Sequence, residues 1–279
     1  MKIRYLGTSA AEAVPAMFCG CDFCRLARKA GGKNIRTRSQ ALIDGKLLID
    51  FGPDTNYHSL EYGIALSEIQ TCIVTHSHYD HLYVEDIKNR KPGFSHLDKN
   101  TPPLAFFGLK PVINIIYDFL KKCNMQNGDD VRVQAVKCFE PFFAEGFRIT
   151  ALPAMHDTHA GAVFYMIEKD GKTMLYAHDT GLFTDSVWDF FTKTAPHFDF
   201  VSLDCTSGSK PMNYDTHMNS EKCRFIKDRM ISDRYASEKT VFCLNHFSHN
   251  GLEHLYEDFC ALPQNEGFIV SYDGMEVEF

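Results

Sequence analysis

The sequence predicts an α/β fold in which two packed mixed sheets carry helices on their outer faces. Strand-like apolar runs outnumber the segments with helical periodicity, and two short Asp-Gly-Lys turns join neighbouring runs. Hairpins followed by strands mixed with helices occur in the first half and are repeated approximately in the second. With 279 residues, 44% of them hydrophobic, the chain can build a sizeable core. We expect one large domain over residues 1–279, or two tightly fused halves.

The strands are predicted from short apolar or β-branched runs bounded by turn residues. Asp44-Gly45-Lys46 and Asp170-Gly171-Lys172 are typical of tight hairpin turns, so the runs on either side of each should pair antiparallel. The expected strands are Ile3–Leu6, Gln40–Ile43, Leu47–Asp50, Thr71–Thr75, Leu104–Phe107, Val131–Val136, Phe147–Leu152, Ala162–Glu168, Thr173–Ala177, Phe198–Leu203 and Thr240–Leu244.

The helices are predicted from apolar residues that recur with a helical period between these strands. Pro111 suits the first turn of such a helix, where the N–H that proline lacks would have no partner. Residues 88–103 are rich in Lys, Asn, Gly and Pro and predict a mobile loop near the site. The expected helices are Val84–Asn89, Val112–Lys122, Ser186–Thr194, Ser220–Ser232 and Leu252–Cys260.

Charge and hydropathy restrict the class of partner. The formal charge of −7 and the pI near 6.0 argue against nucleic-acid binding through broad phosphate neutralisation, so we expect a small-molecule substrate. The N-terminus is too polar for a signal peptide, and no apolar run is long enough to span a membrane, which predicts a cytoplasmic protein without a membrane partner. The sequence leaves the oligomeric state open, a homodimer included.

The first chemical signal is the segment His76-Ser77-His78-Tyr79-Asp80-His81, directly after the predicted strand Thr71–Thr75. In extended chain His76 and His78 project to the same side, as two imidazoles on one ion must. Asp80 and His81 follow after the chain turns and can serve a neighbouring ion. Three histidines and an aspartate within six residues after a buried strand predict metal ligands.

Three further candidate ligands also follow predicted strands. His156 comes after Phe147–Leu152, Asp179 after Thr173–Ala177, and His246 after Thr240–Leu244. Taken alone, His156 or His246 would more often be an ordinary hydrogen-bonded histidine. The repeated placement is the stronger signal, because strand ends at one sheet edge converge on one place.

A second group of candidate ligands is the run Cys19-Gly20-Cys21-Asp22-Phe23-Cys24. A tetrahedral zinc site needs a fourth ligand, and His249, three residues after His246, is the natural candidate. Buried reduced cysteines or a local disulfide remain alternatives on spacing alone. The other cysteines are scattered, mostly within apolar runs, where they behave as small buried hydrophobes.

The histidine motif, followed by His156, Asp179 and His246 in that order, resembles the metallo-β-lactamase superfamily over nearly the whole chain. The resemblance implies an αββα four-layer sandwich. It also implies that Asp179 bridges two metal ions and that Asp80 is essential for hydrolysis. One ion would lie on His76, His78 and His156, and the other on Asp80, His81 and His246.

The cysteine run after Leu6-Gly7-Thr8-Ser9, with the later His-x-x-His, is similar to the phosphoribosyl cyclic phosphate phosphodiesterases of bacterial phosphonate breakdown. That resemblance implies a structural zinc on Cys19, Cys21, Cys24 and His249. It also implies that His217, in a polar loop before a helix, contacts substrate phosphate and assists the leaving group. A histidine that merely flanks the helix carries equal weight until geometry is known.

We therefore expect a metal-dependent hydrolase that acts on a small phosphodiester, cyclic phosphodiesters included. Two divalent ions about 3.5–4 Å apart acidify a shared water to give hydroxide and neutralise phosphoryl charge. The mixed ligands suit zinc, manganese or iron without choosing among them. The alternatives are a tRNA 3′-processing nuclease, a thioester or lactone hydrolase, and a noncatalytic metal-dependent sensor or binding module.

Two loops bear on the substrate. Residues 31–39 hold Lys33, Arg36 and Arg38, which either bind an anionic substrate or form a solvated loop, the second being the favoured interpretation. Residues 10–18, with the acidic Glu12, would mark a sister group that takes another ligand.

Overall fold

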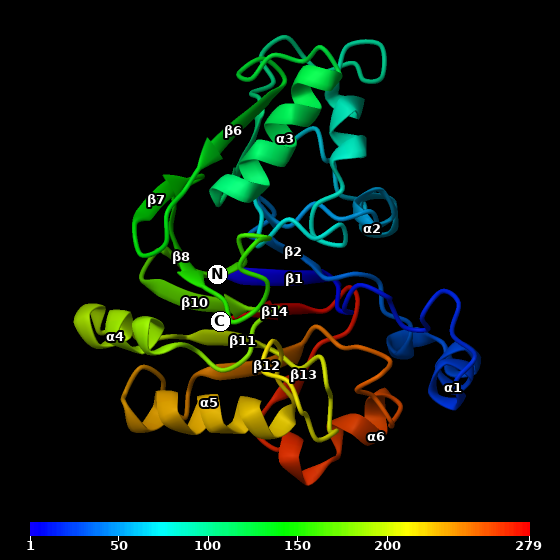
Figure 1. Cartoon of the computed structure of the whole chain (residues 1–279), viewed down its shortest axis with the longest axis vertical. Coiled ribbons are helices and arrows are strands. Elements are labelled where there is room, and N and C mark those ends of the chain that lie inside the picture. Colours follow the sequence, from blue (N-terminus) through cyan, green and yellow to red (C-terminus); the bar gives the residue numbers. More distant parts are fainter.

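Two mixed sheets packed face to face form the centre of the molecule, and helices flank them on both outer sides (Figure 1). The computed structural model describes all residues from Met1 to Phe279. Both termini lie near the middle of the sandwich (Figure 1). The predicted α/β architecture of two packed mixed sheets with outer helices is confirmed.

The first sheet has seven strands in the order β14-β1-β2-β3-β4-β5-β6. Its β14, β1, β2 and β3 pair antiparallel, whereas β3 to β6 run parallel. The strands are β1 (Lys2–Gly7), β2 (Gln40–Ile43), β3 (Leu47–Ile49), β4 (Thr71–Ile73), β5 (Leu104–Gly108), β6 (Val131–Ala135) and β14 (Glu276–Glu278).

The second sheet repeats this plan in the order β13-β12-β11-β10-β9-β8-β7. Its β7 to β10 pair antiparallel and β10 to β13 run parallel. The strands are β7 (Pro141–Ala144), β8 (Phe147–Pro153), β9 (Val163–Lys169), β10 (Lys172–Ala177), β11 (Phe200–Asp204), β12 (Val241–Asn245) and β13 (Ile269–Val270).

The helices divide between the two outer faces, with α2 and α3 beside the first sheet and α4, α5 and α6 beside the second (Figure 1). The α-helices are α1 (Asp22–Ala30), α2 (Thr55–Tyr62), α3 (Lys110–Lys122), α4 (Asp185–Thr194), α5 (Ser220–Ser232) and α6 (Tyr256–Cys260). Three short 3₁₀ helices are η1 (Gly32–Asn34), η2 (Val84–Arg90) and η3 (Pro263–Asn265).

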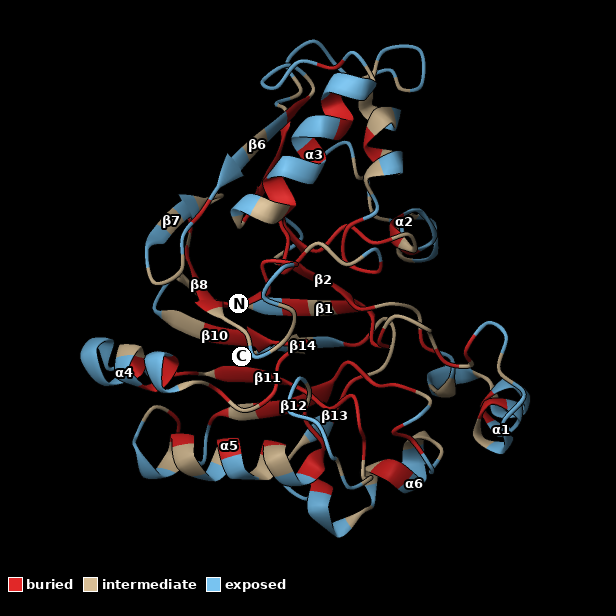
Figure 2. Ribbon diagram, viewed as in Figure 1, coloured by how far each residue is buried: buried red, intermediate tan, exposed pale blue.

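The four layers follow from the alternation of side chains along each strand. On β9, Tyr165 and Ile167 point into the apolar core shared by the two sheets, whereas Phe164 and Met166 face the core under α4 and α5. On β3, Leu48 faces a third core against α3 while its neighbours face the shared one. Burial follows the same pattern, with buried central strands between helices whose outer faces are exposed, whereas the edge strands β6 and β7 are largely exposed (Figure 2). The fold is therefore the αββα four-layer sandwich.

Both predicted hairpin turns are present. Asp44 and Gly45 have φ of 48° and 68°, and Asp170 and Gly171 have φ of 50° and 74°. Two successive positive φ values are what a two-residue hairpin turn requires, and Asp-Gly adopts them at low cost. The turns join β2 to β3 and β9 to β10 in antiparallel pairs.

Two predicted helices differ from the structure. The segment predicted as Val84–Asn89 is the 3₁₀ helix η2, and the one predicted as Leu252–Cys260 begins only at Tyr256. The backbone N–H of Tyr256 donates to the side-chain oxygen of Asn34, which fixes the start of α6. None of the helices combines the length and the apolar character that crossing a bilayer requires.

Candidate metal centre

The polar residues gather at one edge of the sandwich because the strands that carry them end there. Parallel strands place their carboxyl ends at a common edge, and this holds for β3 and β4 in one sheet and for β10, β11 and β12 in the other. The residues delivered there are Asp50 after β3, His76 to His81 after β4, His156 after β8, Asp179 after β10, Asp204 at the end of β11 and His246 after β12.

Three of these residues have left-handed backbone conformations. The φ angles are 70° at Asp50, 49° at Asp179 and 63° at His246. Asp and His tolerate this region better than most residues, but it is sparsely populated outside glycine. Such conformations persist where the surroundings hold them, and here they turn each side chain sharply out of its strand toward the shared edge.

The first cluster consists of His76, His78 and His156, which the sequence assigned to one ion. His76 Nε2 lies 3.0 Å from His78 Nδ1, and His156 Nε2 lies 3.3 Å from the same atom. Burial lowers the pKa of His76 and of His156, so their rings are kept neutral. Neutral imidazole is the form that binds a metal.

The second cluster consists of Asp80, His81 and His246, the set that the sequence assigned to the other ion. His81 Nε2 lies 3.1 Å from Asp80 Oδ2. Asp179 stands between the clusters: its Oδ2 lies 2.8 Å from both His81 Nε2 and His246 Nε2, and its Oδ1 lies 3.8 Å from His156 Nε2. One carboxylate thus presents one oxygen to each cluster, as a bridging ligand would.

The donor atoms of the second cluster fit a metal ion better than they fit one another. His81 Nε2, His246 Nε2 and Asp179 Oδ2 are buried, and none has a hydrogen-bond partner despite their short separations. Buried polar atoms without partners are costly, and such a set converging on one point has the chemistry of a ligand shell.

The charges of the second cluster agree with a cation site. Burial disfavours charge on His246, but Asp179 and Asp204 outweigh it and raise its pKa to about 10. Burial likewise opposes ionisation of Asp80, yet the neighbouring His81 lowers the pKa of this carboxyl to about 2. The carboxylates therefore stay ionised, and histidine protons supply the positive charge that a divalent ion would replace.

Four of the five candidate histidine ligands are oriented from behind by a further polar group, and His156, whose Nδ1 has no partner, is the exception. His81 Nδ1 lies 2.7 Å from Asp50 Oδ2, His246 Nδ1 lies 2.8 Å from Thr206 Oγ1, and His76 Nδ1 lies 3.0 Å from Thr75 Oγ1. The His78 ring uses its nitrogens the other way round: Nε2 contacts Asp157 Oδ2 at 3.2 Å, and Nδ1 faces the cluster. These contacts fix which nitrogen of each ring is free to bind metal. Asp50, Thr75, Asp157 and Thr206 were not singled out from the sequence.

Changing Asp50 to asparagine is expected to weaken metal binding about 10–100-fold, because His81 loses the buried carboxylate that orients it. Calorimetric titration of the metal-free protein measures this affinity. Asp44→Asn, a change in the hairpin turn that touches no candidate ligand, is the matched control. Unchanged affinity in Asp50→Asn would remove the positioning role.

His217 also lies in this centre. Its Nδ1 is 3.0 Å from the buried Asp204 Oδ2, which leaves Nε2 as the nitrogen available to a ligand in the cleft. Burial alone would lower the pKa of His217, but attraction to Asp204 outweighs it and raises the pKa above the ordinary value. The structure therefore places His217 at the site, as the sequence predicted. Its partner Asp204 was not singled out from the sequence.

The cysteine cluster is assembled at the start of α1. Cys19, Cys21, Cys24 and His249 bring their four ligand atoms within 4.8 Å of one another, and all ten cysteines of the chain are free thiols. Two groups lower the pKa of the Cys21 thiol to about 6: the backbone N–H of Cys24 has the larger effect and the side chain of His249 the smaller. Burial raises the pKa of Cys24 to about 11, so this thiol needs a nearby cation to ionise at neutral pH. Three cysteines and one histidine form a donor set suited to tetrahedral zinc.

A polar cleft of about 530 Å³ opens onto the two histidine clusters. His78, Asp80, His156, Asp179 and His246 line its floor, together with His217. From the loops come Glu12, Ser207, Lys210, Tyr214, Ser248 and Asn250. This is where a substrate would meet the metal ligands.

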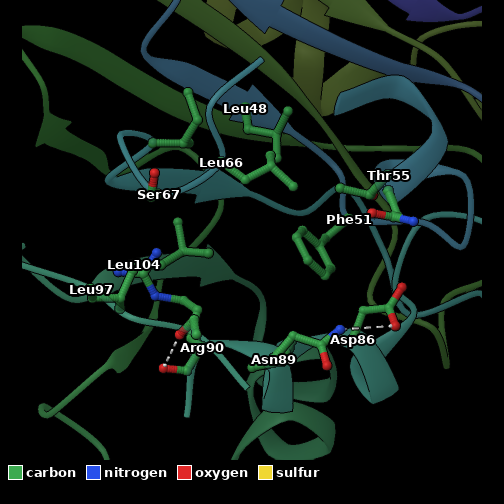
Figure 3. A pocket seen from close by; sticks show the side chains of 14 residues that line it. Leu48, Phe51, Thr55, Leu66, Ser67, Asp86, Asn89, Arg90, Leu97 and Leu104 are labelled. Atoms are coloured by element: carbon green, nitrogen blue, oxygen red, sulfur yellow. Dashed lines mark hydrogen bonds between the residues drawn. The ribbon is translucent and has the colours of Figure 1, made fainter. Parts of the chain in front are cut away.

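A second cavity, of about 210 Å³, is half apolar and lies between β3, α2 and η2 (Figure 3). Phe51 and Leu48 line it, and Arg90 in its wall donates to the carbonyl of Pro102. No cluster of candidate metal ligands lies there, so we place the chemistry in the polar cleft. None of residues 88–103 lines the polar cleft, and the prediction that this loop lies near the site is wrong.

The cationic loop of residues 31–39 serves the fold. Arg36 is buried, donates to Thr8 Oγ1 and the Ser271 carbonyl, and stacks over the Phe247 ring at 4.4 Å. Arg38 forms an ion pair with Asp54 at 2.9 Å. Neither guanidinium lines the cleft, so the interpretation as an anion-binding loop is not supported for them. The favoured interpretation of a solvated loop is wrong for the buried Arg36, whereas Lys33 is exposed.

Comparisons with known proteins agree with this geometry. The family model of the beta-lactamase superfamily domain matches residues 46–235, which hold most of the candidate histidine and aspartate ligands but neither His246 nor the cysteine cluster. No curated protein shows a significant sequence match.

Solved structures share the fold over the full length. A crystal structure described as a new diphosphatase from the PhnP family is 22% identical, with a TM-score of 0.73, and the match covers 100% of this chain and 98% of that one. Zn(2+)-bound PqqB from Methylobacterium extorquens is 17% identical, with a TM-score of 0.75 and 100% of both chains covered. The short form of human tRNase Z is 14% identical, with a TM-score of 0.64 and 100% and 99% covered.

Proposed function

This chain belongs to the beta-lactamase superfamily, and from that premise we propose that it is a phosphodiesterase using two divalent metal ions to hydrolyse a small phosphodiester. One observation carries the proposal: the two oxygens of Asp179 face separate groups of histidines. A single carboxylate placed in this way suits a pair of ions and has no evident purpose in a site for one.

The residues present can hold both ions. His76, His78 and His156 would bind the first, Asp80, His81 and His246 the second, and Asp179 both. Zinc, manganese or iron would suit these ligands. Such a pair supplies Lewis acidity, which makes water nucleophilic at neutral pH and neutralises charge on a phosphoryl group.

A phosphodiester is favoured over a thioester or lactone by features outside the metal ligands. The cysteine cluster with His249 is present, as the resemblance to the cyclic phosphate phosphodiesterases requires. One structure with a similar fold is described as a diphosphatase of the PhnP family, a description that indicates a phosphorus-containing substrate. The cleft is small and mostly polar, which suits a compact ester, and Lys210 is the only lysine in its lining.

In this reaction His217 would hold the proton for the leaving group. Asp204 orients its ring through Nδ1 and raises its pKa, so that Nε2 can donate from within the cleft. The Asp204 carboxylate is itself held by the backbone N–H groups of Thr206 and Met218. Asp204 therefore presents the His217 ring to the substrate in a fixed orientation.

Changing His217 to glutamine is expected to lower kcat about 10²–10⁴-fold on alkyl phosphodiesters, and less on p-nitrophenyl esters, whose leaving group needs no proton. Rates on the two esters and metal content together measure the effect. His254→Gln, at an exposed position, is the control. Equal losses on both esters, or loss of a metal ion, would exclude His217 as the proton donor.

The function is tested with bis(p-nitrophenyl) phosphate and purified protein loaded with zinc or manganese. We expect turnover that is lost on chelation and restored by two equivalents of metal per centre. No turnover with both ions bound would overturn the phosphodiesterase. Cleavage of a precursor tRNA trailer in preference to small cyclic phosphodiesters would instead indicate the nuclease.

A further inference from the structure

A single carboxylate, Glu12, enters the cleft from the loop that follows β1. Its side chain is 33% exposed, and it lines the cleft together with Asp80 and His217. We propose that Glu12 selects the substrate by accepting hydrogen bonds from hydroxyl groups on the alcohol part of the ester. The inference rests on the proposed phosphodiesterase function and names its substrate class: a phosphodiester of a polyol.

The protein contacts of Glu12 use only one of its two oxygens. Oε1 accepts from Ser248 Oγ at 2.6 Å and from Asn250 Nδ2 at 3.3 Å, and His249 Nε2 lies 3.8 Å from it. Oε2 has no hydrogen bond or ion pair within the protein. The carboxylate is thus fixed in place while one oxygen remains free for a ligand.

The charge around Glu12 decides what that ligand can be. No lysine or arginine pairs with Glu12, so its carboxylate keeps an unpaired negative charge at the cleft. Lys210, the cation in the lining, is engaged by the Asn250 carbonyl at 2.8 Å and by Glu253. An anionic group would be repelled here. The phosphoryl group therefore faces the histidines, and the part of the substrate that reaches Glu12 must donate hydrogen bonds.

A hydroxyl fits the surroundings better than an ammonium group does. Tyr214 and Ser207, whose hydroxyls lie 2.7 Å apart, also line the cleft and can both donate and accept. A hydroxyl donates and accepts in the same way, whereas an ammonium group only donates. A substrate with several hydroxyls can thus satisfy Glu12 and these side chains together.

The cysteine cluster lies next to this carboxylate. The His249 ring lies between them, with Nδ1 3.9 Å from Cys21 Sγ and Nε2 toward Glu12. A ring bound through Nδ1 carries its proton on Nε2, which faces Glu12 Oε1 at 3.8 Å.

The test uses three p-nitrophenyl phosphodiesters with the same leaving group, whose second alcohol is propyl, 2,3-dihydroxypropyl or 3-aminopropyl. We expect the wild-type protein to prefer the dihydroxypropyl ester over the propyl ester in kcat/KM. In Glu12→Ala that ratio should fall about tenfold, as loss of a hydrogen bond to a charged group implies. Glu257→Ala, which removes an exposed carboxylate outside the cleft, should keep the ratio.

Glu12→Gln keeps the shape of the side chain and guards against a misfolded variant. It should retain its zinc content and part of the hydroxyl preference, because an amide can still bond a hydroxyl. Three results would overturn the inference: no hydroxyl preference in wild type, a stronger preference for the aminopropyl ester, or an equal loss on all esters in Glu12→Ala. Absence of hydrolysis of every ester by the wild-type, metal-loaded protein would be failure of the proposed function instead.

Discussion

Replacement of Asp179 by alanine is expected to reduce phosphodiester hydrolysis about a thousandfold and to lower metal content at the histidine centre. Asp179 is the residue whose oxygens face both clusters, so its loss removes a ligand from each proposed ion. A metal pair supplies several kcal/mol of transition-state charge stabilisation, which corresponds to this loss of rate. Steady-state rates and metal analysis on the same samples measure both effects.

The control for Asp179→Ala is Asp189→Ala, which removes an exposed carboxylate in the middle of α4. It should keep wild-type activity and metal content. Circular dichroism would show whether Asp179→Ala is folded. A folded variant that keeps both its metal and its turnover would exclude Asp179 as a shared ligand.

Replacement of Cys21 by serine is expected to remove about one equivalent of zinc and to lower the melting temperature by about 5–10 °C. The cluster ties the loop before α1 to His249, two segments that are far apart in the sequence. Without the metal, those segments lose their shared anchor. Zinc analysis and thermal unfolding of the metal-loaded protein measure the two effects.

Cys123→Ser is the matched control, because Cys123 is a half-buried free thiol at the end of α3 and lies outside the cluster. Its zinc content and melting temperature should match those of the wild type. If Cys21→Ser also matches the wild type in both measurements, the cysteines do not hold zinc.

Most of the architecture could be predicted because the strands are short, apolar and bounded by turn residues. Asp44-Gly45 and Asp170-Gly171 indicated the two hairpins, and the repeated order of elements indicated two sheets. Helices α1 and α2 were not predicted from the sequence. Helix α1 buries only Cys24 and Ala27, and α2 only Thr55 and His58, which are too few residues to show a helical pattern. Strands β13 and β14 are short and form only by pairing with β12 and β1.

The histidine centre could be predicted to the extent that its residues follow strands. Seven candidates from His76 to His246 converge as expected, because the strands end at one edge. Asp50 and Asp204 also lie at the ends of strands, yet a lone aspartate at such a position is more often a turn residue. What distinguishes them is the imidazole that each orients, and that contact joins segments distant in sequence.

The side-chain direction of Glu12 could not be predicted from the sequence. The sequence indicates a loop at residues 10–18, but the direction of this side chain depends on Ser248 and Asn250, more than two hundred residues later. Side-chain direction in a loop is set by such contacts, which no local pattern encodes.

The binuclear centre is tested most directly by anomalous X-ray diffraction from crystals of the metal-loaded protein, recorded on both sides of the zinc and manganese absorption edges. We predict two peaks about 3.5–4 Å apart on either side of Asp179, and a third, zinc peak among Cys19, Cys21, Cys24 and His249. A single peak at the histidine clusters, or none beside Asp179 at saturating metal, would contradict the binuclear centre.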